Sequence, residues 1–339
     1  EHKMGIHASP TCVMSFGETE GAVGFLIGEE QAGMRYMFTM MNSARVGVGI
    51  EGLAIGERAY QRARQFASER RQGRVQGAAA TESVPIISHP DVRRMLMTIK
   101  AYNEAMRALL YTNAEAFDRE KFSETAEERE LAAERVALLT PITKAWSTDL
   151  GVELASLGIQ IHGGMGFVEE TGAAQYLRDA RIAPIYEGTN GIQSIDLVTR
   201  KITMRQGDVV NELLDEVADT ASSASGGYAE MGEHLDRALA SLREATTHLL
   251  KVMPSDPDQA LAGATPYLKM FGTVLGGWFH LRSAIAASSL LDAGDGDDSF
   301  LRGRIGLARF YCGQLLPQVE GLLPSVLAPA SDLALENLA

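Results

Sequence analysis

Residues 185–193 read IYEGTNGIQ and place one carboxylate, that of Glu187, in a glycine-containing turn between two helical patterns. Pro184 ends the first helical pattern, and the apolar stripe of the second pattern begins at Ile192. The apolar residues before Glu187 would exclude water from one side of its carboxylate, and a carboxylate in a dry setting is a stronger base for a weak carbon acid. The residues alone therefore indicate either a catalytic base or a carboxylate that caps the following helix.

Helical periodicity extends in both directions from this turn and predicts a mainly α fold. The first long helix is expected from about Glu30 to Arg70. Near its start, Met34 and Met37 have the spacing of side chains that pack in an apolar core. One face of this helix carries small residues, and since glycine destabilises a helix by about 1 kcal/mol relative to alanine, such a row predicts the close approach of another helix. The row consists of Gly49, Gly52, Gly56 and Ala59.

Four more helices are expected before residue 205. Ser88 as N-cap and Pro90 in the first turn open a helix that runs to about Phe117. A charged stretch over residues 118–135 separates this helix from the next one. The remaining helices are predicted over residues 140–162, 171–180 and 192–204.

A second helical bundle of about four helices is predicted over residues 205–339. Its helices are separated by polar breaks at residues 222–227, 254–257 and 294–298. The last of these breaks is acidic, but the glutamate that an EF-hand needs at its twelfth position is missing. We therefore expect a solvated turn there.

Residues 1–28 differ in their sequence pattern from the helical remainder of the chain. Two short apolar stretches, over residues 12–16 and 23–27, are punctuated by glycines and predict two short strands, or a strand and a loop. So little sequence cannot form a complete sheet, so we interpret this segment as the end of a β-domain and the chain as a fragment of a longer protein. The expected domains are residues 1–28, 29–204 and 205–339.

The overall composition excludes some classes of partner. The net charge of the 339-residue chain is −13, which argues against nucleic acids and anionic membranes as partners. No apolar run is long enough to predict a transmembrane helix. The two cysteines, Cys12 and Cys312, are far apart in sequence, which favours a reducing cytoplasm. The seven histidines lack the spacing of metal ligands, so no metal site is expected.

Two further motifs are candidates for binding phosphate groups. Residues 160–167 read QIHGGMGF, and backbone exposed by Gly163 and Gly164 after a helix can approach a ligand closely. Ordinary helix termination explains the same glycines. Residues 69–74 read ERRQGR, and their arginines can bind phosphates bidentately or form a solvated helix end.

These three motifs, in this order and with these intervals, resemble the acyl-CoA dehydrogenase family. The resemblance covers about residues 1–204, and its most specific part runs from Arg178 to Thr189. Residues 205–339 are similar to the extra helical domain of a larger subgroup, which includes 3-methylthiopropionyl-CoA dehydrogenases. The resemblance implies the family's C-terminal helical bundle, preceded by a remnant of the middle β-domain and followed by a second helical bundle.

The same resemblance implies an FAD cofactor and an acyl-CoA substrate. Glu187 matches the family's catalytic base, which removes the α-proton of the thioester while the flavin accepts a hydride from the β-carbon. The backbone N–H of the base helps to bind the thioester carbonyl, and Gly188 permits the turn that aims this N–H. Arg45 matches an arginine near the thioester and the base, and Asn42 stands where many members have an aspartate that faces CoA.

Other residues match the family's contacts with FAD. Arg70 matches an arginine that contacts the FAD pyrophosphate of a partner subunit. Gln160, Gly163 and Gly164 match a segment along the adenosine side of the same FAD, and Thr189 matches a residue near the ADP portion of the cofactor. A homodimer or higher homo-oligomer is therefore implied.

The activity implied is an acyl-CoA dehydrogenase of fatty acid β-oxidation that passes its electrons to an electron-transfer flavoprotein. Two alternatives remain open. The first is a helical module that only dimerises and has no catalytic role. The second is an acyl-CoA oxidase, which gives its electrons to oxygen.

Overall fold

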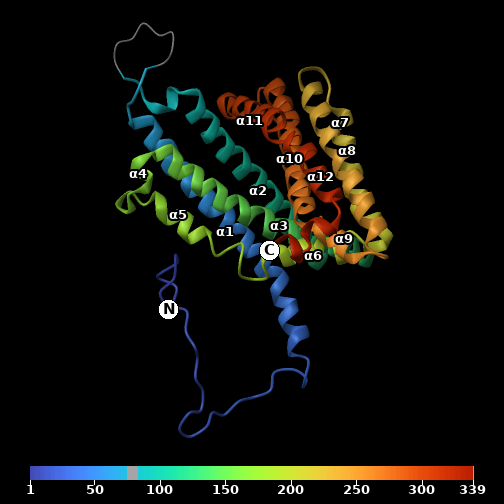
Figure 1. Cartoon of the computed structure of the whole chain (residues 1–339). Coiled ribbons are helices and arrows are strands. Elements are labelled where there is room, and N and C mark those ends of the chain that lie inside the picture. The colour runs from blue at the N-terminus through green and yellow to red at the C-terminus, as the bar shows by residue number, and fades with distance from the viewer. Residues whose placement is uncertain (75–82, 339) are drawn as a thin grey trace.

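The computed structural model describes residues 1–74 and 83–338, and the mainly α fold predicted from the sequence is confirmed there (Figure 1). The α-helices of these residues are α1 (Gly33–Glu69), α2 (Pro90–Phe122), α3 (Ala126–His162), α4 (Gly164–Phe167), α5 (Ala173–Ala180), α6 (Asn190–Asp196), α7 (Asp208–Ser223), α8 (Ala229–Val252), α9 (Pro257–Ala262), α10 (Ala264–Ala293), α11 (Asp298–Phe310) and α12 (Gln318–Leu327). A π-helical turn, Leu197–Lys201, continues α6, and a second, Tyr311–Leu315, follows α11.

Helices α1 and α3 run parallel and in close contact, with α2 beside them (Figure 1). Small residues make this contact possible, as the row on α1 predicted. A Cβ atom placed on Gly52 would lie 2.2 Å from the carbonyl oxygen of Ser147 and therefore could not be accommodated. Further along both helices, Ala59 packs against Gly158. Backbone-to-backbone packing of this kind fixes the position of α1 along α3.

Helix α10 is the centre of the second group of helices and is buried along most of its length. It packs against α7, α8, α11 and α12, and also against α2 and α3. Aromatic side chains join the two groups: the ring of Tyr102 on α2 lies edge-on to both Trp146 and Tyr311, with centroid distances of 6.1 Å and 5.7 Å. One continuous apolar core therefore extends through both groups. The domain boundaries given above stay a prediction.

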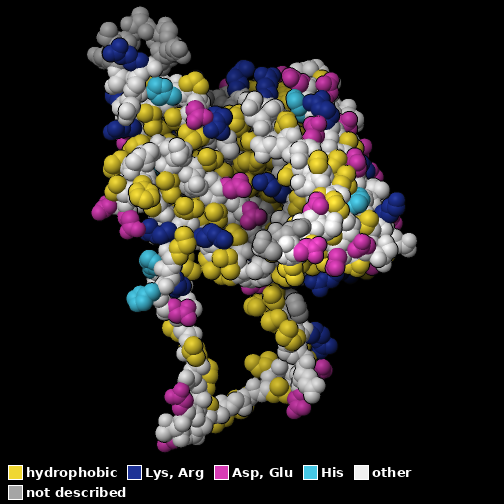
Figure 2. Space-filling view, viewed as in Figure 1, with side chains coloured by type: hydrophobic (Ala, Val, Ile, Leu, Met, Phe, Trp, Pro, Cys, Tyr) yellow, Lys and Arg dark blue, Asp and Glu magenta, His cyan; other side chains and the backbone are white. Residues whose placement is uncertain are grey.

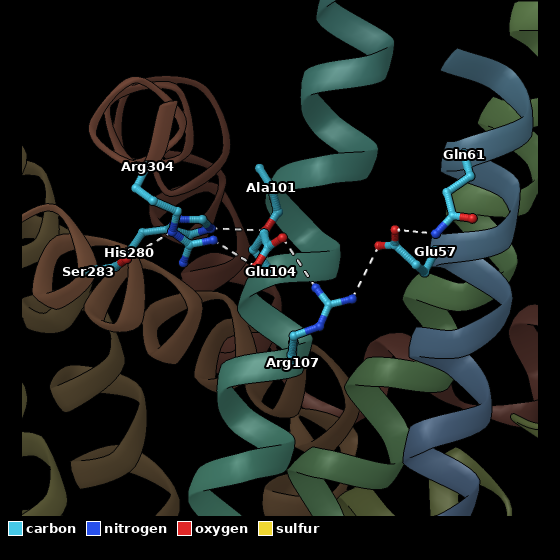
Figure 3. Close-up of polar contacts among 8 residues, drawn as sticks. All are labelled: Glu57, Gln61, Ala101, Glu104, Arg107, His280, Ser283 and Arg304. Carbon is cyan, nitrogen blue, oxygen red and sulfur yellow. Dashed lines mark hydrogen bonds and ion pairs between the residues drawn. The ribbon is translucent and has the colours of Figure 1, made fainter. Parts of the chain in front are cut away.

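A chain of ion pairs also crosses the molecule from α1 to α11 (Figure 3). Arg107 on α2 lies 3.3 Å from Glu57 on α1 and 3.2 Å from Glu104 on its own helix. Glu104 in turn lies 2.7 Å from Arg304 on α11. These side chains are about a fifth to a third exposed, so their charges are partly shielded from water. The chain of ion pairs thereby links α1 to the second group of helices.

Part of the charged stretch over residues 118–135 is helical, which corrects the predicted start of α3 near residue 140. The cause is a capping box in which the hydroxyl of Thr125 accepts from the backbone of Glu128 while the Glu128 carboxylate accepts from the Thr125 backbone. Pro141 lies inside the helix and deprives it of one hydrogen bond. The residues around it are almost all buried, so tertiary packing offsets that loss.

The strands expected over residues 12–16 and 23–27 are absent from the described structure, and this prediction was wrong. A strand needs a neighbouring strand as hydrogen-bonding partner, and no described segment pairs with either stretch. Instead the segment forms an open loop with hydrophobic side chains that face solvent, such as Val13 and Phe25 (Figure 2). Its first residues dock on α5, where the Ile6 N–H donates to the Asp179 carboxylate at 2.6 Å.

The start of α1 also differs from its prediction. Met34 is 62% exposed and Met37 is 36% exposed, because the first turns of α1 project beyond the other helices (Figures 1 and 2). The side chain of Phe38 lies outside the described part of the chain.

In the second group the three polar breaks fall between helices as predicted, but the structure has six α-helices there rather than about four. The additional ones are short, because Gly263 and Pro317 interrupt the helical run.

The contact between α1 and α3 predicts a large penalty for any side chain at Gly52. We expect Gly52→Val to lower the free energy of unfolding by about 2–3 kcal/mol, because the new Cβ would meet backbone that cannot move aside. Gly47→Ala is the matched control. Gly47 is an exposed glycine of the same helix, and a Cβ placed on it would meet no described atom of another segment within 4 Å. Alanine there should raise stability by up to about 1 kcal/mol. Denaturant midpoints measure both changes, and equal midpoints would rule out the close contact.

A second prediction concerns His280, whose Nε2 donates to the Ala101 carbonyl at 2.9 Å (Figure 3). Burial lowers the pKa of this imidazole to about 4, so the folded state favours its neutral form. Its stabilising contribution is complete above pH 6.5, where the unfolded chain is also neutral, and is lost as the pH falls from 6.5 towards 4. The loss should reach roughly 3 kcal/mol.

The measurement is the free energy of unfolding between pH 4 and pH 7 for the unchanged chain and for His280→Gln. Glutamine keeps a donor but does not titrate in this range, and all other titrations are common to the two proteins. The unchanged chain should lose stability more steeply on acidification. Parallel curves would show that His280 is not held neutral.

Candidate active site

The turn that carries Glu187 links α5 to α6 and has an unusual backbone. Glu187 has a φ of 56°, and Gly188 follows with a φ of 78°. A residue other than glycine in the left-handed region costs roughly 1 kcal/mol or more. Glycine is favoured at the next position, because a side chain at this φ would be strained and a Cβ on Gly188 would also displace Nε2 of Gln193, 2.8 Å away. The turn is therefore strained at Glu187 and has to be held by its surroundings.

Helix α3 supplies the groups that hold the turn. Lys144 is completely buried, and its Nζ donates to the Gly188 carbonyl and to Oδ1 of Asn190, each at 2.8 Å. The amide nitrogen of Asn190 donates to Thr148 at 3.0 Å and to the carboxylate of Asp149 at 2.7 Å. Asn190 is also the first residue of α6, so these bonds fix the end of the turn against α3.

Helix α1 holds the other side of the turn. The hydroxyl of Tyr186 donates to the carboxylate of Glu51 on α1. Burial, the hydrogen bond to Glu51 and the charge of this carboxylate raise the pKa of Tyr186, so the hydroxyl remains a donor at neutral pH. The residue before Glu187 is thereby attached to α1, and Gly188 and Asn190 after it are attached to α3.

Several buried polar atoms at this end of the molecule have no hydrogen-bond partner among the described residues. They include Oε1 of Glu187, Nε of Arg45 and Oε1 of Gln193. Arg45 is 9% exposed, and its Nη1 donates to Oδ1 of Asn42 at 3.4 Å. A buried polar atom without a partner is costly, and in a native protein it calls for an explanation such as a catalytic role or a bound water or ligand. The Glu187 carboxylate offers an acceptor to a ligand here, and the Arg45 guanidinium offers a donor.

The charges around this site act on one another through Lys144. Burial lowers the pKa of Lys144 to about 8. The negative charges of Asp149, Glu187 and Glu51 raise this pKa, whereas the positive charge of Arg45 lowers it. The ammonium, the guanidinium and the Glu187 carboxylate thus belong to one electrostatic cluster.

The glycine-rich motif and the arginine motif lie together at the C-terminal ends of α1 and α3. The ring of Phe66 stacks on that of His162 with a centroid distance of 4.5 Å, so the two helices end side by side. Arg70 is exposed there, with its Nη2 3.3 Å from the side-chain oxygen of Gln72. Gln160, Gly163 and Gly164 are exposed as well, and no described atom lies within 4 Å of a Cβ placed on either glycine. This end therefore has open backbone next to an exposed guanidinium.

The residues predicted from the sequence thus form two separate groups. Lys144 and His162 are 18 residues apart on α3, which corresponds to roughly 27 Å along the helix. One group, at the Lys144 end, consists of Asn42, Arg45, Glu187, Gly188 and Thr189. The other group, at the His162 end, consists of Arg70, Gln160, Gly163 and Gly164. The hydroxyl of Thr189 accepts from the backbone of Ile192 at 3.3 Å and caps α6.

Sequence reasoning missed the residues that hold the turn, namely Lys144, Asn190 and Glu51. For Lys144 a signal was present. Residues 138–148 are uncharged apart from Lys144, and such a run is typical of a buried helical segment. A lysine is almost never fully buried unless its charge has partners, so its position in that run pointed to a specific contact.

The described residues were compared with two further kinds of site, a metal-ligand cluster and a membrane-spanning helix. Within residues 1–74 and 83–338, no three His, Cys, Asp or Glu side chains are grouped so that they could hold a metal ion. None of the helices described is both long and apolar enough to cross a membrane.

Comparison with protein families gives two matches. Residues 31–202 match the family described as acyl-CoA dehydrogenase, C-terminal domain. Residues 213–335 match the family described as acetyl-CoA dehydrogenase C-terminal like. The motifs at residues 69–74, 160–167 and 185–193 all lie within the first match.

Individual relatives agree with these matches. The chain is 44% identical over 319 residues to 3-methylmercaptopropionyl-CoA dehydrogenase of Ruegeria pomeroyi, which covers 93% of this chain and 53% of that protein. It is 34% identical over 330 residues to a butyryl-CoA dehydrogenase of Syntrophomonas wolfei, covering 95% of this chain and 54% of that protein. The chain thus spans about half the length of these curated relatives.

Solved structures share the fold. An acyl-CoA dehydrogenase from Bacillus anthracis, solved as a complex with FAD, superposes with a TM-score of 0.69 at 16% identity, covering 88% of this chain and 50% of that chain. ACDH-11 of Caenorhabditis elegans, solved in complex with C11-CoA, gives a TM-score of 0.64 at 21% identity, covering 86% and 46% of the two chains.

Proposed function

The chain belongs to the acyl-CoA dehydrogenase family, and on this premise we propose that, as part of a longer protein, it supplies the base for FAD-dependent α,β-dehydrogenation of an acyl-CoA thioester. The product is the trans-2-enoyl-CoA. One observation carries the proposal: the buried Oε1 of Glu187 has no partner among the described residues and sits on a strained turn held by two helices. A non-catalytic dimerisation module has no need of such an arrangement.

The carboxylate of Glu187 is suited to remove the α-proton. Its free oxygen has a lone pair available for the proton, and its burial limits competition from water. The backbone N–H of Glu187 donates to no described group, so it is available to the thioester carbonyl, where negative charge develops as the proton leaves. Arg45, which belongs to the same electrostatic cluster, offers a buried N–H without a described partner. When bound, FAD would accept the hydride from the β-carbon.

The proposed FAD contacts come from two chains. Arg70, Gln160, Gly163 and Gly164 fit a phosphate and adenosine group, because exposed backbone with open space lies beside a guanidinium there. These residues are roughly 27 Å along α3 from the groups that hold Glu187. We therefore assign the two ends of one chain to two different flavins, with Arg70 serving the site of a partner subunit. A homodimer or higher homo-oligomer follows from this assignment.

The electrons are proposed to pass to an electron-transfer flavoprotein, within fatty acid β-oxidation in the cytoplasm. The alternative is an oxidase that gives its electrons to oxygen. Release of peroxide on addition of acyl-CoA distinguishes the two.

Glu187→Gln tests the base in the complete protein. Glutamine keeps the shape of the side chain but cannot accept the proton, so anaerobic bleaching of the flavin by acyl-CoA should slow by at least about 100-fold while the FAD content stays unchanged. Glu170→Gln, at an exposed carboxylate outside the site, is the control and should bleach normally. Bleaching of the Glu187→Gln enzyme at the unchanged rate would refute the assignment.

A hybrid dimer tests the assignment of Arg70 to the partner's flavin. One chain carries Arg70→Ala and the other Glu187→Gln, and two different affinity tags allow the hybrid to be purified. If each site combines Glu187 of one chain with Arg70 of the other, one site of the hybrid is intact and about half of the activity remains. If both residues serve the same site in one chain, both sites are damaged and the hybrid is no more active than the single-variant homodimers.

A further inference from the structure

Lys144 is the most unusual charged residue in the described structure. Its side chain is completely buried in the middle of α3, yet it forms no ion pair within 4 Å with any described carboxylate. A buried ammonium without hydrogen bonds would be very costly. Its charge is instead met by two neutral oxygens, the carbonyl of Gly188 and the side-chain carbonyl of Asn190. Both belong to the turn that carries Glu187.

Few other contacts could replace these two bonds. Apart from Lys144, the one described residue that donates to the Gly188 carbonyl is Gln193, at 3.4 Å. Within the same part of the chain, Oδ1 of Asn190 otherwise accepts only from Thr148, at 3.3 Å. Lys144 thus makes the two shortest bonds to these oxygens, at 2.8 Å each. Without it, the Gly188 carbonyl beside the left-handed backbone at residues 187 and 188 would lose its short bond to α3.

The charge of Lys144 also acts on the site. Four charged groups that influence it are Arg45 and Glu51 on α1, Asp149 on α3 and Glu187 itself. The attraction between the ammonium and the Glu187 carboxylate is mutual, and the low polarity of the surroundings strengthens it. The ammonium therefore attracts the carboxylate towards the position that the turn gives it.

We propose that Lys144 is a positioning residue for Glu187, whose buried ammonium holds the turn so that the carboxylate and the adjacent N–H face the thioester together. The inference rests on the proposed function. Lys144 touches neither substrate nor flavin and acts only through the residues of the turn. The FAD contacts at the opposite end of α3 do not involve it.

Lys144→Met in the complete protein removes the charge and the donor but keeps the length of the side chain. A misplacement of about 1 Å can slow a reaction about 100-fold, so bleaching at saturating acyl-CoA, expressed per bound FAD, should fall by that order. FAD content and the dissociation constant of acyl-CoA should change little. Thr143→Val is the matched control. Thr143 is buried next to Lys144 on α3 and accepts from Asn113 at 3.1 Å, so its loss should lower stability without slowing bleaching.

A rescue experiment separates positioning from mere structural support. Lys144→Ala leaves space for propylamine, whose ammonium can reach the same two oxygens. Added propylammonium should restore bleaching several-fold, whereas propanol, which has no charge, should restore much less. Bleaching by Lys144→Met at the unchanged rate, or equal rescue by amine and alcohol, would overturn the inference.

Two further outcomes are informative. If Lys144→Met does not fold, Asn190→Ala tests the same contact from the other side and should slow bleaching, whereas an unchanged rate contradicts the inference. If the unaltered protein with FAD bound is not bleached by any acyl-CoA, the proposed function itself fails. Normal bleaching of both the unaltered protein and the Lys144 variants overturns only the role of Lys144.

Discussion

Contact between α3 and the turn at residues 187–190 is the interaction on which the candidate site depends. The turn contains two consecutive residues in the left-handed region, one of which is a glutamate. Such a backbone relaxes unless its surroundings determine it. Here a buried ammonium and a network through Asn190 attach it to α3, and the pair of Tyr186 and Glu51 attaches it to α1. The position of the carboxylate is therefore set by two rigid helices rather than by a loop.

The relative position of α1 and α3 is determined by small residues. Backbone meets backbone at Gly52, and this fixes both the site around Glu187 and the distant surface around Gly163. Because both surfaces lie on the same two helices, the distance between them is fixed by the half of α3 that runs from Lys144 to His162. A second group of helices supports α3 and α2 from behind through α10 and the chain of ion pairs that ends at Arg304. The fold thus acts as a rigid frame that carries two separate ligand surfaces.

Much of this frame could be predicted from the sequence, because periodicity and glycine placement are local signals. The row of small residues on α1 indicated a close helix contact, and the structure confirms it. The predicted strands near the N-terminus were wrong, since a strand depends on a partner that local sequence does not reveal. The late start predicted for α3 was wrong because the capping box at Thr125 begins the helix earlier, within the charged stretch. The uncharged run around Lys144 signals a specific contact, but the partners of Lys144 and Glu51 could not be predicted because the contacts join residues 44 and 135 positions apart in the sequence.

A crystal structure of the complete protein with FAD and a bound acyl-CoA tests the central claim most directly. The account predicts that the Glu187 carboxylate lies within about 3–3.5 Å of the substrate α-carbon, with Lys144 still bonded to the Gly188 carbonyl. It also predicts that the Gly163 segment beside this flavin comes from a partner subunit. A Glu187 side chain directed into bulk water, with no space for a thioester beside it, would contradict the account.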